Sequence, residues 1–469
     1  MYEKNPIIIY NLFPPLAGKI SKWEQNLHQI AEMGFTWIYI NPINQRGYSN
    51  SLYSIKNYFL LDSAFADSKN DQQEWNSFIE FVRNAHKIGL KVMLDIVINH
   101  TAVDAVSEHP NWYKYKWVLR NRSNLHPVRI FEEILKSEIN YDKNRFPPEN
   151  FELVYIVAPP YAINPVNTND IQIWGDLAEI NFNEPYLPEI LEFFKKYLKF
   201  CIDLGVDGFR ADAAYQVPGT IWKEFIEFCK EVNPEVIFWA ETLGGNYEQH
   251  VQLMNSGFDF ITNSSKWWDF TASWCVEQHE EYAKIAPSIS FPETHDTPRL
   301  AAESGGRKDV QVFRYLFASF FSEGLMMPIG YELGATERLS VIMEDFTQMG
   351  QTLFDIRRDI QKINTFKKKY PGMMDEGKLY HYPYENLGVL ILKKEHSQKH
   401  SQLLLIYNKD WHNAQKVDLP DIREILSYQS PIFQIDIKNN QKRLDNFKIT
   451  TWLPPNHFLL YYQLNQDLN

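Results

Sequence analysis

Short apolar runs alternate with amphipathic stretches along most of the chain. The amphipathic stretches repeat apolar residues every three or four positions, as Trp75, Phe78 and Val82 do, and this spacing predicts helices. Apolar runs that alternate with helices are typical of βα units around a parallel sheet. Eight such runs match the strands of a closed (β/α)8 TIM barrel, so we predict an α/β fold of that type. The predicted strands are Ile7–Phe13, Trp37–Ile40, Lys91–Ile98, Val206–Arg210, Val236–Ala240, Phe258–Ile261, Ile289–Phe291 and Leu325–Ile329. The clearest predicted helices are Trp75–Ile88, Leu187–Leu204, Ile221–Val232 and Val310–Phe321.

Two segments depart from this alternation. From about Thr101 to Glu184 the chain is rich in Pro, Asn and aromatic residues and is too long for an ordinary loop, so we predict an inserted subdomain after the third strand. After the basic run Lys367–Lys369, which we expect to be a solvated linker face, short β-rich runs are separated by turns. The predicted domains are a barrel over 1–100 and 185–375, the inserted subdomain over 101–184 and an all-β C-terminal sandwich over 376–469.

Composition and charge exclude several classes of protein. With 469 residues, 44% hydrophobic and 23% charged, the chain is expected to fold around substantial cores, which excludes a disordered or fibrous protein. A formal charge of -12 is unfavourable for binding a nucleic-acid backbone, so we expect no nucleic-acid partner. No apolar run is long enough to span a membrane, and we expect a cytoplasmic protein without a membrane partner. Cys201, Cys229 and Cys275 are widely spaced and are expected to be buried free thiols.

Carboxylates follow the predicted strands at the end where TIM barrels place their catalytic side chains. Asp212 stands two residues after Arg210, a spacing that puts both side chains on one side of an extended segment, where the cation would favour an ionised carboxylate. Glu241 follows the apolar residues Ile237–Trp239, and apolar surroundings would raise its pKa. Two carboxyl groups in opposite protonation states are what glycoside hydrolysis requires.

Together these segments resemble the four sequence blocks of the α-amylase family, whose members act with retention on α-glucosidic bonds. The blocks are DIVINH (Asp95–His100), GFRAD (Gly208–Asp212), AETLG (Ala240–Gly244) and FPETHD (Phe291–Asp296). GFTWIYINPI (Gly34–Ile43), LAEIN (Leu177–Asn181) and GYELG (Gly330–Gly334) are similar to further family segments in the same order.

The resemblance implies roles for individual residues. Asp212 matches the nucleophile that attacks the anomeric carbon, and Glu241 matches the general acid/base. Asp296 matches the carboxylate that binds sugar hydroxyls at the cleaved position and helps distort the ring. Arg210, His100 and His295 match residues that orient the nucleophile or hold that sugar, and Tyr53 matches a tyrosine that stacks on it, with Tyr48 as a less favoured candidate.

Some positions depart from the family pattern. Tyr215-Gln216 stand where many members have Lys-His against the leaving-side sugar, Thr294 stands in place of Asn, and Glu179 in place of Asp. Trp267 and Trp268 are candidates for a wall of the leaving-side subsites or for packing behind the loop. His28, His86 and His250 lie on helical stretches and are expected at the surface.

The resemblance implies no required cofactor. Asn99 matches a calcium ligand of many members, but it is the one ligand that the sequence identifies, and Ca²⁺ takes six to eight oxygens. Calcium therefore stays open at this stage.

The favoured function is hydrolysis of α-1,4-glucosidic bonds in glucans or maltooligosaccharides through a covalent glycosyl-enzyme. Because Tyr215-Gln216 differ from the common hydrolase pattern, a transglycosylase such as a 4-α-glucanotransferase or a maltosyltransferase is the alternative. A catalytically silent binding protein is disfavoured by the intact Asp212, Glu241 and Asp296. Oligomeric state, chain-length preference and acceptor are left open by the residues.

Overall fold

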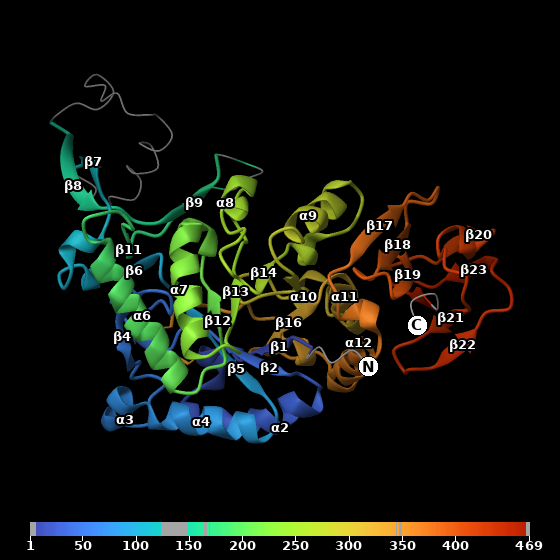
Figure 1. Cartoon of the computed structure of the whole chain (residues 1–469), viewed down its shortest axis with the longest axis horizontal. Coiled ribbons are helices and arrows are strands. Elements are labelled where there is room, and N and C mark those ends of the chain that lie inside the picture. The colour runs from blue at the N-terminus through green and yellow to red at the C-terminus, as the bar shows by residue number, and fades with distance from the viewer. Residues whose placement is uncertain are drawn as a thin grey trace.

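A computed structural model describes residues 6–122, 149–163, 167, 169–343, 345–346 and 349–465. At its centre eight parallel strands close into a barrel in the order β1-β16-β15-β14-β13-β12-β5-β2 (Figure 1). The ring closes because β1 pairs with β2 on one edge and with β16 on the other. The strands are β1 (Ile8–Asn11), β2 (Trp37–Ile40), β5 (Lys91–Ile96), β12 (Gly208–Ala211), β13 (Ile237–Ala240), β14 (Phe260–Thr262), β15 (Ser288–Ser290) and β16 (Gly324–Pro328). All eight predicted strands are confirmed.

Two apolar layers hold the barrel together. Alternate strand residues such as Ile9, Met93 and Met326 point inward and fill the barrel, as its narrow interior demands. The other residues of the same strands, such as Ile8 and Ile38, pack outward against the surrounding helices. The strands are therefore buried on both sides, which explains why they read as continuous apolar runs.

Helices surround the barrel, and each predicted one is present within a few residues of its expected ends. The described helices are α1 (Pro14–Ala17), α2 (Glu24–Glu32), α3 (Lys69–Glu74), α4 (Asn76–Lys87), α6 (Leu187–Asp203), α7 (Gly219–Val232), α8 (Tyr247–Val251), α9 (Trp274–Tyr282), α10 (Leu300–Glu303), α11 (Lys308–Phe321) and α12 (Arg357–Lys369). No helix in the described ranges is both long and apolar enough to cross a membrane. Cys201, Cys229 and Cys275 are buried free thiols, as expected.

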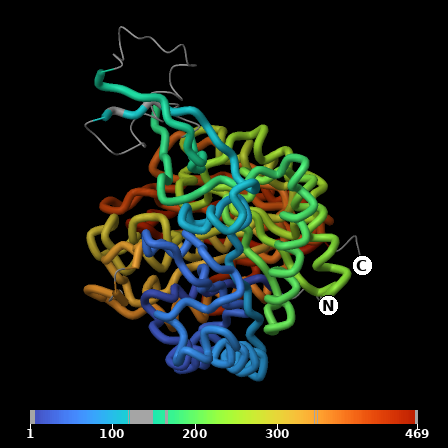
Figure 2. Tube along the Cα trace, turned by 90° about the vertical axis from the view of Figure 1, so that its left-hand side faces the viewer, coloured from blue at the N-terminus to red at the C-terminus, as the bar shows by residue number. Residues whose placement is uncertain are grey.

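The chain between β5 and α6 forms small antiparallel sheets at the carboxyl end of the barrel. Its described strands are β6 (His100–Ala102), β7 (Tyr115–Asn121), β8 (Phe151–Val157), β9 (Tyr161–Ile163), β10 (Ile171–Ile173) and β11 (Leu177–Glu179). They pair as β6 with β11, β7 with β8, and β9 with β10. In both whole-chain views the β7–β8 hairpin projects away from the barrel (Figures 1 and 2). A separate hairpin of β3 (Asn44–Arg46) and β4 (Ile55–Leu61) lies between β2 and α3.

The C-terminal part of the chain is all β and lies beside the barrel, on the right of Figure 1. A six-stranded antiparallel sheet has the order β17-β18-β19-β24-β21-β22, and β20 pairs with β23. One face of the larger sheet packs on α11, where the rings of Phe313 and Tyr407 stack with centroids 3.6 Å apart. An apolar cluster including Ile391, Ile406 and Val417 joins the larger sheet to the β20–β23 pair. The strands are β17 (Lys378–Tyr382), β18 (Val389–Glu395), β19 (Ser401–Asn408), β20 (Gln415–Leu419), β21 (Ile432–Ile435), β22 (Gln441–Arg443), β23 (Ile449–Leu453) and β24 (Phe458–Leu464).

Two surface expectations are wrong. Lys367 lies in α12, not in a linker, and its fully buried ammonium donates to the carbonyls of Ser319, Ser322 and Met373. His250 is also buried, because the short helix α8 turns it toward the barrel loops, where it hydrogen-bonds the Thr242 carbonyl at 2.8 Å. In both cases backbone carbonyls accept hydrogen bonds from a side chain that we expected to find in solvent.

Candidate active site

The four family-like blocks meet at the carboxyl end of the barrel. Asp212 directly follows β12 and Glu241 directly follows β13, and these two strands are neighbours in the sheet. Asp296 lies in the segment after β15, and Tyr53 lies in the loop that joins β3 to β4. Because parallel strands end at the same edge, residues far apart in the chain converge there.

The guanidinium of Arg210 joins the carboxyl groups of the site. It is almost fully buried and lies 2.9 Å from Asp212 and 2.8 Å from Asp95, with Glu241 at 4.0 Å. A buried cation of this kind stabilises nearby carboxylates and fixes their orientation. The expected pairing of Arg210 with Asp212 is therefore present, and Asp95 is an additional partner.

Glu241 is held in a mostly buried position next to the nucleophile candidate. Its carboxylate accepts a hydrogen bond of 2.9 Å from the backbone N–H of Ala213, the residue after Asp212. Ala213 has a left-handed backbone, with φ 40°, which is unfavourable for a residue with a side chain. Burial, assisted by the charges of Asp212 and Asp296 and opposed by Arg210, raises the pKa of Glu241 to about 8. The expectation of a proton held near neutrality is confirmed.

Asp212 shares its buried surroundings with Glu241 but not its partners. Burial and the charge of Asp296 raise the pKa of Asp212, whereas the ion pair with Arg210 opposes the rise. The Arg210 guanidinium lies 2.9 Å from Asp212 but 4.0 Å from Glu241. This ion pair therefore favours the ionised form of Asp212 more than that of Glu241. The two carboxyl groups therefore differ in their distance from the Arg210 cation, and a retaining glycosidase uses a pair of carboxyl groups in different environments.

Asp296 is the most exposed of the three carboxylates. Its side chain is 59% exposed and lies 3.0 Å from the Nε2 atom of His295. Partial burial alone would raise its pKa, but His295 and the charges of Arg210 and Arg338 outweigh that effect and lower it to about 2. Arg338, which the sequence did not single out, also donates to the backbone carbonyl of Asp296 at 2.7 Å. Asp296 is thus an ionised and largely exposed carboxylate.

Tyr53 lines the site together with His295. The two rings stack with centroids 5.9 Å apart, and the Tyr53 hydroxyl lies 2.8 Å from the Nε2 atom of His295. The same hydroxyl donates to Asp95 at 2.8 Å. Tyr39 donates to the same oxygen of Asp95. Tyr48, the other candidate for this position, is 66% exposed.

Asp95 and Tyr39 are site residues that sequence reasoning did not single out. Burial raises the pKa of Asp95 to about 6, even though Arg210 lowers it. The available signal was a carboxylate inside the otherwise apolar run Lys91–Ile98, because a buried charge needs a partner.

His100 is buried, whereas Trp267 is about half exposed. The Nε2 atom of His100 contacts the Tyr53 carbonyl at 3.1 Å, its buried Nδ1 atom has no protein partner in the part of the chain that is described, and burial lowers its pKa to about 4. Trp267 is 49% exposed. Its neighbour Trp268 is completely buried and donates to Gln278, so Trp268 packs behind the loop. For Trp267, a place in the wall of the leaving-side subsites stays a prediction.

The chain is similar to known proteins in sequence and in fold. A family model described as the glucanotransferase domain of glycogen debranching enzyme matches residues 3–118. An α-1,4-glucan:maltose-1-phosphate maltosyltransferase of Corynebacterium glutamicum is 22% identical over 87% of this chain, which spans 59% of that protein's length. A maltogenic α-amylase of Bacillus acidopullulyticus is 21% identical over 85% of this chain and 64% of its own. The crystal structure of a maltogenic α-amylase from Thermotoga neapolitana has a TM-score of 0.68 at 19% identity and covers 98% of both chains.

These similarities support the α-amylase family that the sequence blocks resemble. The chain departs from the pattern common in that family just after Asp212, at Tyr215 and Gln216. Tyr215 is buried, and an added Cβ atom at Gly244 would lie 3.1 Å from its hydroxyl, so Tyr215 packs against the loop that carries Glu241. Gln216 donates to the Tyr161 carbonyl at 3.0 Å and accepts from Asn99 at 3.2 Å. The Gln216 amide thus joins the loop after β12 to β9.

The residues around Asn99 do not form a calcium shell within the described ranges. The amide oxygen of Asn99 is buried without a protein partner there, which makes it a possible oxygen ligand. However, none of the described residues form a group of three or more His, Cys, Asp or Glu side chains that could hold a metal ion. Since Ca²⁺ takes six to eight oxygens, calcium binding at Asn99 stays a prediction.

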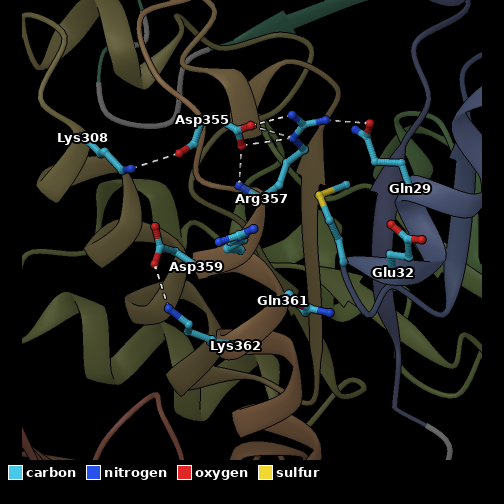
Figure 3. A pocket seen from close by; sticks show the side chains of 10 residues that line it. Gln29, Glu32, Lys308, Asp355, Arg357, Asp359, Gln361 and Lys362 are labelled. Carbon is cyan, nitrogen blue, oxygen red and sulfur yellow. Dashed lines mark hydrogen bonds and ion pairs between the residues drawn. The ribbon is translucent and has the colours of Figure 1, made fainter.

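A polar cavity of about 700 Å³ lies away from these residues, between α2 and the start of α12 (Figure 3). Arg357 dominates it, but its guanidinium pairs with Asp355 and donates to Gln29 at 2.8 Å. Lys362 lies 3.6 Å from Asp359 on the same helix. The lining includes none of the catalytic candidates, and its charges largely compensate one another.

Replacement of Arg210 by methionine is expected to destabilise the folded chain. Asp95 and Asp212 would then be buried without their cation, and breaking a buried ion pair costs about 3–5 kcal/mol. Urea unfolding followed by circular dichroism measures the effect. Arg338→Met removes an exposed arginine at the same site and should change the free energy of unfolding by less than about 0.5 kcal/mol. If the two variants were equally stable, the ion pairs of Arg210 would not be what stabilises the buried carboxylates.

Proposed function

We propose that the chain is a retaining α-glycosidase that hydrolyses α-1,4-glucosidic bonds in glucans or maltooligosaccharides. The observation that carries the proposal is the contrast between two neighbouring carboxyl groups. Asp212 is ion-paired with Arg210 at 2.9 Å, whereas the pKa of Glu241 is raised to about 8. One carboxylate is therefore prepared to attack and one carboxylic acid to donate a proton.

The reaction follows from these two groups. Asp212 forms a bond to the anomeric carbon as the bond from that carbon to the leaving oxygen breaks, and Glu241 gives its proton to that oxygen. Glu241, now ionised, then takes a proton from water. The water oxygen bonds to the anomeric carbon as the ester bond to Asp212 breaks, and the original configuration is restored. Asp296, Tyr53 and His295 would hold the sugar while its ring distorts.

Transfer to a sugar hydroxyl is the second candidate function. The same glycosyl-enzyme forms, and a sugar replaces water in the second step. Tyr215 and Gln216, which depart from the common hydrolase pattern, favour this alternative. The similarity to a maltosyltransferase favours it as well, whereas the similarity to a maltogenic α-amylase favours hydrolysis.

Incubation with maltoheptaose and separation of the products tests the proposal. Hydrolysis gives only shorter oligosaccharides, whereas transfer also gives longer ones. No product, with maltoheptaose alone or with maltose 1-phosphate added, would contradict both candidates and would leave a catalytically silent carbohydrate-binding protein. The expected cytoplasmic location stays a prediction that cell fractionation tests.

We expect catalysis without a bound metal, because each step uses carboxyl groups of the chain. Extensive dialysis against EDTA should leave kcat/KM on maltoheptaose unchanged, and it should leave the melting temperature unchanged as well. Addition of Ca²⁺ after dialysis is the control. A fall in melting temperature that Ca²⁺ reverses would contradict this expectation and would make Asn99 a calcium ligand.

A further inference from the structure

The β7–β8 hairpin of the inserted region has two faces of different character. In an antiparallel pair, directly opposite residues point to the same side and alternate residues to the other. Val118 is opposite Val154, and both pack with Ile173 and Tyr161 in a small apolar cluster against the β9–β10 ribbon. Trp117 is opposite Tyr155, and this pair points the other way, away from that ribbon.

The outward face presents aromatic rings to solvent. Trp117 is 60% exposed and Tyr155 is 57% exposed. Their ring centroids lie 5.1 Å apart, with an angle of 43° between the planes. The ring of Tyr115 stacks on the other side of Tyr155 at 5.4 Å, and its hydroxyl donates to the Pro110 carbonyl at 2.9 Å. Tyr115, Trp117 and Tyr155, together named the aromatic face, thus form a supported row and not a set of isolated side chains.

The aromatic face is uncharged. The lysine, arginine and glutamate residues of the two strands, Lys116, Arg120 and Glu152, occupy the alternate positions of the opposite face. Arg120 pairs there with Glu152, and the ammonium of Lys116 lies 5.3 Å from the centre of the Tyr161 ring. A charged ligand would therefore find no counter-ion among the residues of the aromatic face, whereas a neutral ligand with flat apolar surfaces suits it.

The exposed apolar area on this side of the hairpin is smaller than a stable protein interface needs. Trp117 and Tyr155, each aromatic side chain with about 150–250 Å² in total, and Leu153, which is 51% exposed on the same side, leave a few hundred Å² for a partner. A stable protein interface needs about 800 Å² per partner. Two rings at an angle instead match successive glucose units of an α-1,4-linked chain, which turn relative to one another and present C–H faces.

We infer that the aromatic face of the β7–β8 hairpin is a second glucan-binding site, separate from the catalytic carboxylates. The inference rests on the proposed function, which supplies the class of ligand. The site lies on the side of the hairpin opposite Tyr161, the residue whose carbonyl contacts Gln216 next to the catalytic groups. It binds a long glucan at a distance from the bond that is cleaved, so it acts on polymers and not on short oligosaccharides.

The double variant Trp117→Ala/Tyr155→Ala tests this inference. Loss of two stacking rings is expected to lower kcat/KM on amylose by about fivefold to tenfold and to leave kcat/KM on maltotetraose unchanged. Trp452→Ala is the matched control, because Trp452 is 66% exposed in the C-terminal sheet and should affect neither substrate. Far-ultraviolet circular dichroism and the melting temperature show that each variant is folded.

A binding measurement separates failure of this inference from failure of the proposed function. In native gels that contain amylose, the unsubstituted chain should be retarded more strongly than the double variant, whether or not it turns over glucan. Equal retardation, together with equal kcat/KM on amylose, would overturn the inference and show that the aromatic face has another occupant. Equal loss of activity on both substrates would also overturn it, because it would show a merely structural role. No turnover of either substrate by the unsubstituted chain would overturn the proposed function alone.

Discussion

Replacement of Asp212 by asparagine is expected to lower kcat/KM on maltoheptaose by about 10⁴-fold or more, a loss typical of removing a catalytic nucleophile. The amide cannot form the glycosyl ester, although its shape preserves the hydrogen bond from Arg210, which lies 2.9 Å from the carboxylate. Initial rates of reducing-sugar release measure the effect. The fold should be retained, since Asp212 lies at the end of β12 and contributes no apolar packing.

The matched control for this variant is Asp203→Asn. Asp203 ends α6, and its side chain is 58% exposed, so its replacement removes an equal charge far from the reacting groups. Its activity should equal that of the unsubstituted chain. If Asp212→Asn kept activity within tenfold of that control, Asp212 would not be the nucleophile.

Replacement of Glu241 by glutamine is expected to lower kcat/KM on maltoheptaose by about 10²- to 10⁴-fold, the range that general acid–base catalysis contributes. The unsubstituted chain should lose kcat/KM as the pH rises through about 8, because Glu241 must be protonated to donate and its pKa is raised to about 8. Glutamine does not titrate, so the variant should lack this alkaline fall. Initial rates between pH 5 and pH 10 measure both effects.

An activated substrate separates the roles of the two carboxyl groups. α-Glucosyl fluoride has a leaving group that needs little protonation, so Glu241→Gln should lose much less activity on it than on maltoheptaose, whereas Asp212→Asn should lose activity on both. Glu224→Gln, an exposed residue of α7, serves as the control. Equal losses of Glu241→Gln on both substrates would contradict its role as general acid.

The barrel could be predicted from the sequence because its strands are buried on both sides. Runs such as Lys91–Ile98 consist mainly of apolar residues because both of their sides are buried. In the helix Leu187–Leu204, apolar residues recur at regular spacing along one side. The strands β20 and β22 were not predicted. Both are short, and β22 exposes every residue of Gln441–Arg443, so no apolar alternation marks it.

Site residues that directly follow a strand could be predicted from the sequence. Site residues whose place depends on contacts between distant segments could not. Asp212 and Glu241 stand at strand ends, and their joint placement within the family-like blocks indicates them. The partners of Asp95 come from β2 and β12, and Arg338 reaches Asp296 from a loop more distant in the chain. The buried Lys367 shows the same limit, because its three carbonyl partners come together only when α12 packs on α11.

Covalent trapping tests the central claim that Asp212 and Glu241 act as nucleophile and acid/base. The unsubstituted chain is treated with 5-fluoro-α-glucosyl fluoride, whose fluorine at C5 slows both steps while its fluoride leaves readily, and its peptides are then examined by mass spectrometry. The expected result is one added fluoroglucosyl group, carried by the peptide that contains Asp212 and absent from the Asp212→Asn variant. A label on another residue, or turnover of the reagent with inversion and no label, would contradict the account.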